Sequence, residues 1–347
     1  MRWFEGAGVR LQEEDNGRIF PVSGDAMTVV GALRREMERA GVEVRCNARV
    51  TGIQACADGF SLSVETTVTG RQGHDDCRNK PSRGMQSSQP WRPATASAVI
   101  VTTGGSPKAS GLGFLSPLGL DIEPPVPSLF TLKTDDTGLK ALMGTVAPGA
   151  ILSLPGTPIK AAAPLLLTDW GFGGPATLKL SSYAARLLAD CGYRTRIAVN
   201  WTGENEQQTR GRLAGIAAGN PQKQLTNTPP PGLPARLWAF LLGRSGLRAD
   251  LRWAEFGSKG LNRLVSTLTN DGYSVTGRAA FKEEFVTCGG VSLSNLNPAT
   301  LEAKAHPGLF FAGEVLDIDA VTGGFNLQAA WTTGWICARS AADFLKK

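Results

Sequence analysis

The 347-residue chain is long enough for about two domains, and a composition of 42% hydrophobic and 19% charged residues is typical of a globular protein with a sizeable core. Six cysteines without a CxxC pair and only two histidines argue against a zinc site, a His-rich metal site and a disulfide framework, and they favour a reduced, cytoplasmic protein. The net charge of +6 is small and its Arg and Lys are spread along the chain, so we expect no nucleic-acid partner; no signal peptide and no membrane-spanning run is evident.

Residues 18–54 predict an α/β unit. Apolar residues at helical spacing between positions 29 and 37 predict a helix that Ser23 or Asp25 caps and that Gly41 ends. Residues 42–46 then alternate like a strand, and residues 60–68 predict another. The polar segment 71–96 has almost no aliphatic residues, so we expect an exposed, disordered loop.

The segment AVIVTTGG, residues 98–105, predicts a strand that lies buried on both faces at the centre of a sheet. It ends in Thr103, Gly104 and Gly105. Such a turn lets the chain pass under a dinucleotide, but it is equally typical of a tight turn at the end of any strand.

The middle of the chain has a different character. The Pro-rich segment 123–129 is typical of a crossing between domains, and β-like runs follow at 129–132, 151–154, 165–168 and 197–200. Residues 204–268 predict a small helical region. The glycines in the turn 171–174 either admit a ligand or serve a sharp chain reversal, and we favour the reversal.

The last segment, 308–345, predicts a strand, a loop and a long helix. The strand 309–312 ends in Gly313 and Glu314, and Glu314 and Asp317 offer acceptors for ribityl or ribose hydroxyls. Thr322, Gly323 and Gly324 then open the helix, whose first N–H groups and positive dipole end suit a pyrophosphate or the pyrimidine edge of a reduced flavin. A plain strand-to-helix turn is the alternative.

Several nucleotide-binding and hydrolase motifs are absent from the sequence. GAGVRL, residues 6–11, contains G-x-G without a third glycine or a preceding apolar strand, so it does not meet the context of a dinucleotide fingerprint. The chain has no P-loop, no G-x-S-x-G elbow and no HExxH.

Four segments carry a resemblance to a known family: GRIFPVSGDA, LLLTDWGFGGPATLKLSSY, EEFVTCGGVSL and GLFFAGEVLDIDAVTGGFNLQAAWTTG. Together they resemble the HI0933-like flavoproteins, also called BaiN-like or aminoacetone-oxidase-like FAD-binding proteins, from about residue 2 to the end. The resemblance implies an α/β fold, in which an incomplete FAD-binding Rossmann-like (two-dinucleotide-fold) domain, 1–125 and 287–347, is interrupted. The insertions are a β-rich, barrel-like domain, 126–203 and 269–286, and a small helical subdomain, 204–268.

The resemblance also implies a set of cofactor-binding residues. Gly313, Glu314 and Asp317 would line the ribityl and pyrophosphate part of FAD. Thr322, Gly323, Gly324, Phe325 and Asn326 would lie beside the isoalloxazine, the turn Thr103–Gly105 near the cofactor, and Val50 beside the adenine.

The chain departs from the family pattern in three ways. Members open with a strand–GxGxxG–helix unit, and about 80–90 residues of that pattern have no counterpart here, so we expect FAD to bind weakly or not at all. The polar loop is longer than usual. Asp169 and Gly173 stand where the family usually has His and Ser.

These observations predict an FAD-dependent oxidoreductase, linked to NAD(P)H, that acts on a small-molecule substrate without a metal or a membrane. No catalytic acid or base is identifiable. Two alternatives stay open: a truncated or degenerate, non-catalytic flavoprotein fragment that does not hold FAD, and an RNA-modifying flavoprotein.

Overall fold

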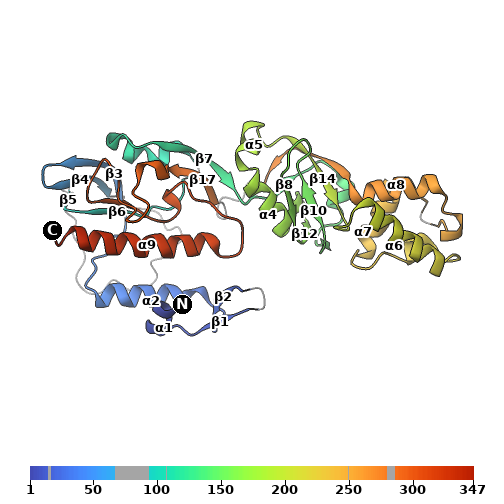
Figure 1. Cartoon of the computed structure of the whole chain (residues 1–347), viewed down its shortest axis with the longest axis horizontal. Coiled ribbons are helices and arrows are strands. Elements are labelled where there is room, and N and C mark those ends of the chain that lie inside the picture. Colours follow the sequence, from blue (N-terminus) through green and yellow to red (C-terminus); the bar gives the residue numbers. More distant parts are fainter. Residues whose placement is uncertain (15–16, 67–93, 107, 249, 280–285) are drawn as a thin grey trace.

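The computed structural model describes residues 1–14, 17–66, 94–106, 108–248, 250–279 and 286–347 as an elongated molecule (Figure 1). Helices and several small sheets alternate along the chain, so the α/β class is confirmed. Most of the predicted polar loop lies outside the described residues; its last part, Ala94–Ala96, is strand β5 rather than loop.

The N-terminal part contains α1 (Arg2–Gly6), a hairpin of β1 (Leu11–Glu13) and β2 (Ile19–Pro21), and α2 (Ala26–Arg39). Asp25 caps α2, because its Oδ1 accepts a hydrogen bond of 2.8 Å from the amide of Met27, as the sequence predicts. The strand predicted at residues 42–46 is wrong. The segment is irregular and Val42 and Val44 are about half exposed, because it pairs with no strand among the described residues.

Two sheets form the body of the part that lies beside α9. β3 (Ala48–Cys56), β4 (Gly59–Thr66) and β5 are antiparallel, and the 3₁₀ helix η1 (Ala109–Leu118) packs on β3. β6 (Val99–Val101) runs parallel to β18 (Leu309–Phe311), and α9 (Phe325–Phe344) packs across both (Figure 1).

The prediction that β6 is buried on both faces is wrong. Ile100 is 38% exposed, because β18 is the only strand that pairs with β6 among the described residues. Parallel strands are normally covered on both faces, so the exposure of Ile100 leaves apolar surface of this small sheet in contact with solvent.

A two-stranded ribbon leads to the other half of the molecule. β7 (Ile122–Ser128) contains the Pro-rich segment and pairs antiparallel with β17 (Val286–Val291), with a β-bulge between Cys288 and Gly290 (Figure 1). The division into three domains at the expected boundaries stays a prediction.

Beyond the ribbon, two antiparallel sheets and the helices packed on them share the largest core. One sheet has the order β11-β10-β14-β15 and the other β16-β8-β13-β12-β9. Their bounds, with the helices among them, are β8 (Leu132–Lys133), α3 (Thr137–Lys140), β9 (Val146–Ala147), β10 (Ile151–Ser153), β11 (Lys160–Ala162), β12 (Leu165–Leu167), β13 (Gly171–Gly173), α4 (Gly174–Tyr183), α5 (Ala185–Asp190), β14 (Thr195–Asn200), β15 (Asp271–Val275) and β16 (Gly277–Arg278).

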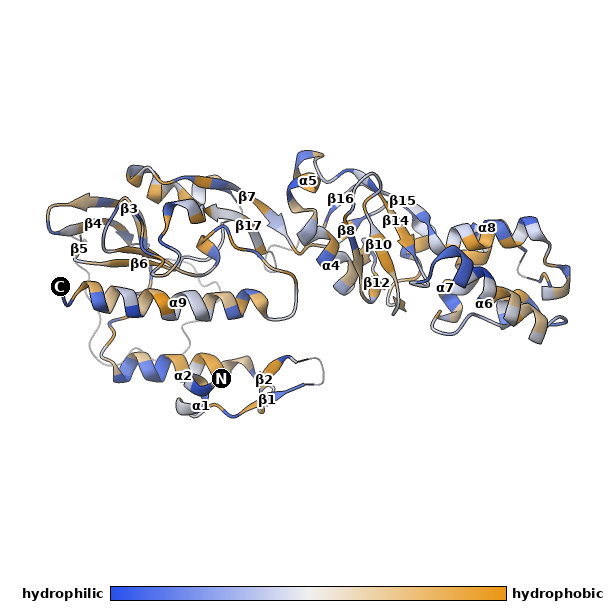
Figure 2. Ribbon diagram, viewed as in Figure 1, coloured by the Kyte–Doolittle hydropathy of each residue, from blue (hydrophilic) through white to orange (hydrophobic). Residues whose placement is uncertain are grey.

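The expectation of a barrel-like domain is not met, since neither sheet closes within the described residues. The strands are two to six residues long, and α4 packs on β10, β11, β12 and β13 instead of another strand. Figure 2 shows hydrophobic residues gathered in these strands and alternating with hydrophilic ones along the helices.

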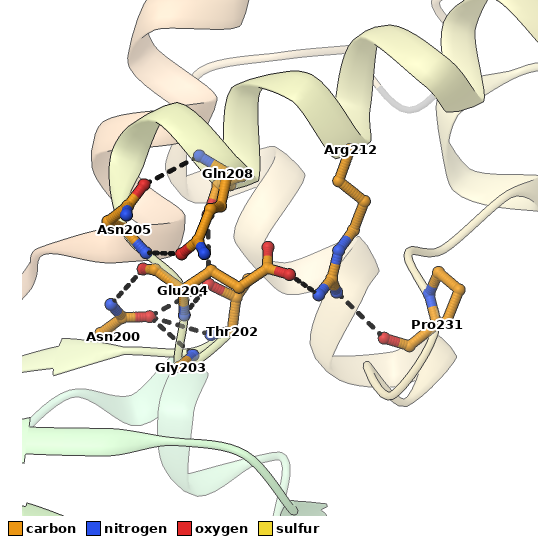
Figure 3. A network of polar contacts seen from close by, with 9 residues as sticks. Asn200, Thr202, Gly203, Glu204, Asn205, Gln208, Arg212 and Pro231 are labelled. Atoms are coloured by element: carbon orange, nitrogen blue, oxygen red, sulfur yellow. Dashed lines mark hydrogen bonds and ion pairs between the residues drawn. The ribbon is translucent and has the colours of Figure 1, made fainter.

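The helical end of the molecule contains α6 (Glu206–Gly219), η2 (Leu225–Asn227), α7 (Ala235–Arg244), η3 (Trp253–Glu255) and α8 (Ser258–Thr269). A polar network fixes its first helix (Figure 3). Asn200 accepts hydrogen bonds from two backbone amides of the following turn, Asn205 and Gln208 form a capping box, and Glu204 pairs with Arg212. The remaining 3₁₀ turns are η4 (Leu293–Asn295) and η5 (Gly313–Val315).

No helix in the described part of the chain is long and apolar enough to cross a membrane. The same residues hold no group of three or more His, Cys, Asp or Glu that could bind a metal ion.

Candidate functional site

The start of α9 is open. Gly324 precedes the helix with φ of 86°, no side chain caps it, and Phe325 is 57% exposed. The first bond of the helix runs from the amide of Gln328 to the oxygen of Gly324, at 2.9 Å. The amides of the first turn therefore present unsatisfied donors and the positive end of the helix dipole at the surface.

The loop that leads into α9 is held by one side chain. Asn326 Oδ1 accepts a hydrogen bond of 2.9 Å from the amide of Ala320, and Asn326 Nδ2 donates one of 2.9 Å to the backbone oxygen of Ala320. Asn326, expected beside a cofactor, thus also shapes the loop 317–324. At the other end, the amide of Gly313 donates to Thr333 Oγ1 at 2.9 Å, which ties η5 to α9.

The structure brings Gly105 and Glu314 together, and it adds a residue from β17. Glu314 Oε1 accepts a hydrogen bond of 2.7 Å from the amide of Thr287. A Cβ at position 105 would lie 2.5 Å from Thr287 Oγ1 and 2.6 Å from Glu314 Oε1, so only glycine fits there. Gly104 has φ of 74°, which also favours glycine, and Thr103 is exposed.

A second polar group lies where the ribbon meets the loop. Asp317 Oδ1 is 3.6 Å from Arg186 NH2 of α5, and Ser128 Oγ of β7 donates to Asp319 Oδ2 at 2.9 Å. Burial, assisted by the negative charge of Asp319, raises the pKa of the nearby Cys288 thiol to about 11, so this thiol is protonated at neutral pH.

Sequence reasoning named none of Arg186, Asp319, Thr287 and Cys288. The available signal was the segment EEFVTCGGVSL, in which Thr287 and Cys288 stand directly before a glycine pair.

Other expected residues lie elsewhere. Val50 packs, half-buried, against the core that β3 shares with η1 and β18, and not in the loop before α9. Residues 171–173 are strand β13 and Gly174 begins α4; Cβ atoms at Gly171 and Gly174 would lie 2.8 Å and 2.9 Å from backbone atoms of Leu132 and Leu166, so close backbone packing accounts for these glycines. The chain reversal that we favoured is the turn at 168–171, which two backbone hydrogen bonds between Thr168 and Gly171 close. Asp169 is exposed in that turn.

Two cavities lie away from the start of α9. The larger, about 260 Å³, is beside Arg244, which pairs with Asp136 and with the buried Asp271. Asp271 also accepts hydrogen bonds from Trp201 and Tyr273, so this network fastens α7 to β15 and leaves no free ligand group on Asp271. The smaller, about 230 Å³, lies against the second half of α9.

Comparisons with known proteins agree with the resemblance in the sequence. The chain is 29% identical to ribosomal RNA dihydrouridine synthase of Escherichia coli over 342 residues, which are 96% of this chain and 76% of that protein. It is 25% identical to the protein of the same name from Haemophilus influenzae, over 96% of this chain and 77% of the relative. It is also 25% identical to 3-dehydro-bile acid delta(4,6)-reductase of Clostridium scindens, over 99% of this chain and 80% of the relative.

The family model described as the HI0933-like protein Rossmann domain matches residues 1–340, nearly the whole chain. The resemblance inferred from four segments is therefore confirmed, and the relatives named as reductase and dihydrouridine synthase support an oxidoreductase. The chain belongs to the HI0933-like family of FAD-binding Rossmann proteins.

Proposed function

We propose that this chain is an FAD-dependent oxidoreductase that reduces a carbon–carbon double bond conjugated to a carbonyl group. The names of its relatives support the reaction class. Dihydrouridine is uridine whose ring double bond has been reduced, and a delta(4,6)-reductase of a 3-dehydro compound reduces double bonds in conjugation with a ketone. Both reactions add a hydride to one carbon of the bond and a proton to the other.

The observation that carries the proposal is the open start of α9. Uncapped amides at a helix N-terminus preceded by an exposed glycine form a site for negative charge, and the pyrimidine edge of a reduced flavin or a pyrophosphate supplies it. FAD, when bound, would supply the hydride to the substrate. The residues present fit that group, because the loop before α9 is fixed by Asn326 and no side chain caps the first amides of the helix.

The proposed binding residues come from four segments. They are Gly313, Glu314 and Asp317 after β18, Thr322, Gly323, Gly324, Phe325 and Asn326 at the start of α9, and Thr103, Gly104 and Gly105 after β6, with Val50 toward the adenine. Glu314 orients β17 by accepting from Thr287, and Arg186 holds Asp317 at the edge of the loop. We take NAD(P)H as the electron donor, because it delivers the two electrons that the reduction consumes.

Reconstitution tests the proposal. The purified chain is titrated with FAD while the flavin fluorescence is followed, NAD(P)H is then added without oxygen, and reoxidation is measured with a uridine-containing RNA and with a conjugated steroid ketone. Because the sequence has no counterpart of the strand–GxGxxG–helix unit, we expect weak but saturable FAD binding, bleaching by NAD(P)H and reoxidation by one of the two substrates. If the flavin fluorescence stays that of free FAD throughout the titration, the chain does not hold FAD and the proposal fails.

A pair of glycine variants tests the helix start. Gly324 and Gly232 are both exposed, both have φ of 86°, and neither has an atom within 4 Å of an added Cβ. Gly324→Ala and Gly232→Ala therefore introduce the same backbone strain, about 1–2 kcal/mol. Only Gly324→Ala should weaken FAD binding; equal FAD affinity in the two variants would remove the helix start from the site.

A further inference from the structure

The positive charge of the chain is concentrated in its helical end. Residues 204–268 contain nine Arg and Lys against four Asp and Glu, a net charge of +5 out of +6 for the whole chain. The excess reflects few acids rather than many bases: these 65 residues hold nine of the 36 Arg and Lys of the chain, but only four of its 30 Asp and Glu. Figure 1 places this region, α6 to α8, at the end of the molecule opposite the small sheet of β6 and β18.

Four of the nine basic side chains have partners that account for them. Arg212 pairs with Glu204, Arg244 pairs with Asp136 and Asp271, and Arg248 pairs with Asp250. The fourth is Arg236 of α7, which donates a hydrogen bond of 2.9 Å to the backbone oxygen of Ala141, outside the helical end. These four are accounted for by structure.

The other five form what we name the basic surface: Arg210, Lys223, Arg252, Lys259 and Arg263. All five are exposed, and none pairs with a carboxylate within the described part of the chain. The carboxylate of Glu255 accepts a hydrogen bond from the backbone amide of Arg252, not from its guanidinium, and caps η3.

Contacts between the helices bring these residues near one another. Lys259 and Arg263 are one helical turn apart on α8, on the same face as Asn262, which accepts a hydrogen bond of 2.8 Å from Arg210 of α6. After α6 ends, the amide of Trp253 donates to the oxygen of Lys223 at 3.1 Å, which places Lys223 beside Arg252. The basic surface thus extends along α6 and α8 and round to η3.

We propose that the basic surface binds the phosphate backbone of an RNA; that the base reduced within this RNA is a uridine is taken from the names of two relatives. Uncompensated Arg and Lys on adjacent elements match a ribose-phosphate chain. The second part rests on the proposed function: the ring double bond of the uracil is broken as one carbon takes the hydride delivered from NAD(P)H through FAD and the other takes a proton. Because the basic surface and the start of α9 lie on different parts of an elongated molecule, a single nucleotide cannot use both (Figure 1).

Binding is measured with the full chain and a labelled uridine-containing RNA by fluorescence anisotropy, between 50 and 200 mM salt. Five phosphate contacts to single-stranded RNA predict a slope of log affinity against log salt of about −3.5, or about a 100-fold loss of affinity over that range. The variant Arg210→Gln/Lys259→Gln/Arg263→Gln should reduce the slope to about −1.4.

The control variant is Arg34→Gln/Arg35→Gln/Lys347→Gln, which removes three exposed positive charges outside the helical end. It should bind RNA as the unaltered chain does. Circular dichroism of both variants verifies that they are folded.

The proposal is overturned if the two triple variants lose equal affinity, or if the salt slope of the first variant is unchanged. Equal affinity for DNA of the same sequence, for uridine monophosphate, or for vesicles rich in phosphatidylglycerol would also overturn it, as the surface would then recognise general negative charge. Since anisotropy requires no flavin, a chain that binds RNA but fails to reconstitute with FAD separates failure of the proposed function from failure of this inference.

Discussion

The two hydrogen bonds of Asn326 allow a quantitative prediction for the loop before α9. Asn326→Ala removes both bonds to Ala320. At about 1 kcal/mol net for each bond, the ordered loop loses about 2 kcal/mol, which corresponds to about a 30-fold change in an equilibrium constant. Because the loop must be ordered to receive the cofactor, the FAD dissociation constant should rise by about that factor.

Two measurements check this prediction independently. FAD titration gives the change in affinity, and hydrogen exchange gives the protection of the Ala320 amide, which loses its acceptor, without any flavin. Gln328→Ala is the control, because Gln328 is exposed on the same helix and its side chain bonds only to Thr332 one turn later.

Asn326→Ala should accelerate exchange at Ala320 and weaken FAD binding, while Gln328→Ala changes neither. Faster exchange with unaltered FAD affinity would show that the loop is no part of the cofactor site. Unaltered exchange would refute the reasoning from the hydrogen bonds themselves.

Three further predictions concern other parts of the molecule. Gly105→Ala forces a Cβ to 2.5 Å from its nearest neighbour and should lower the free energy of unfolding by about 1–3 kcal/mol, measured by urea denaturation. Asp271→Ala leaves a buried network without its acceptor and should cost about 3–5 kcal/mol in the same assay, whereas Asp250→Ala, at an exposed pair, costs about 0–1 kcal/mol. Since the pKa of Cys288 is raised to about 11, its alkylation by iodoacetamide should rise about tenfold per pH unit from pH 8 and level off only near pH 11; peptide mass spectrometry checks this, with exposed Cys56 as the reagent standard, and a plateau below pH 9 contradicts it.

The sequence predicted those elements whose signals are local. The Asp25 cap and the helical spacing after it predicted α2, and the glycines before Phe325 predicted the start of α9. The strand expected at residues 42–46 failed because alternation alone does not provide a neighbouring strand. Likewise, an apolar run predicted a central β6, although the number of partners of a strand is a tertiary property that its own residues do not encode.

Prediction of the candidate site had the same limit. The glycine turns and the acids after β18 were recognisable because each lies within one short segment. The contact among Gly105, Thr287 and Glu314 joins three segments that are far apart in sequence, so no spacing rule reveals it. The same holds for Arg186, which reaches Asp317 from a helix in the other half of the molecule.

The ribbon of β7 and β17 has a mechanical consequence. The amide of Thr287 donates a hydrogen bond to Glu314, and the Cys288 thiol lies near Asp319. The ribbon that joins the two halves of the molecule therefore also lines the candidate site. Bending of the ribbon therefore moves Thr287 and Cys288 relative to the loop that carries Glu314 and Asp319. By thermodynamic linkage, a ligand that fixes these residues in place resists the bending. Saturation with flavin should narrow the spread of end-to-end lengths that small-angle X-ray scattering records for this protein.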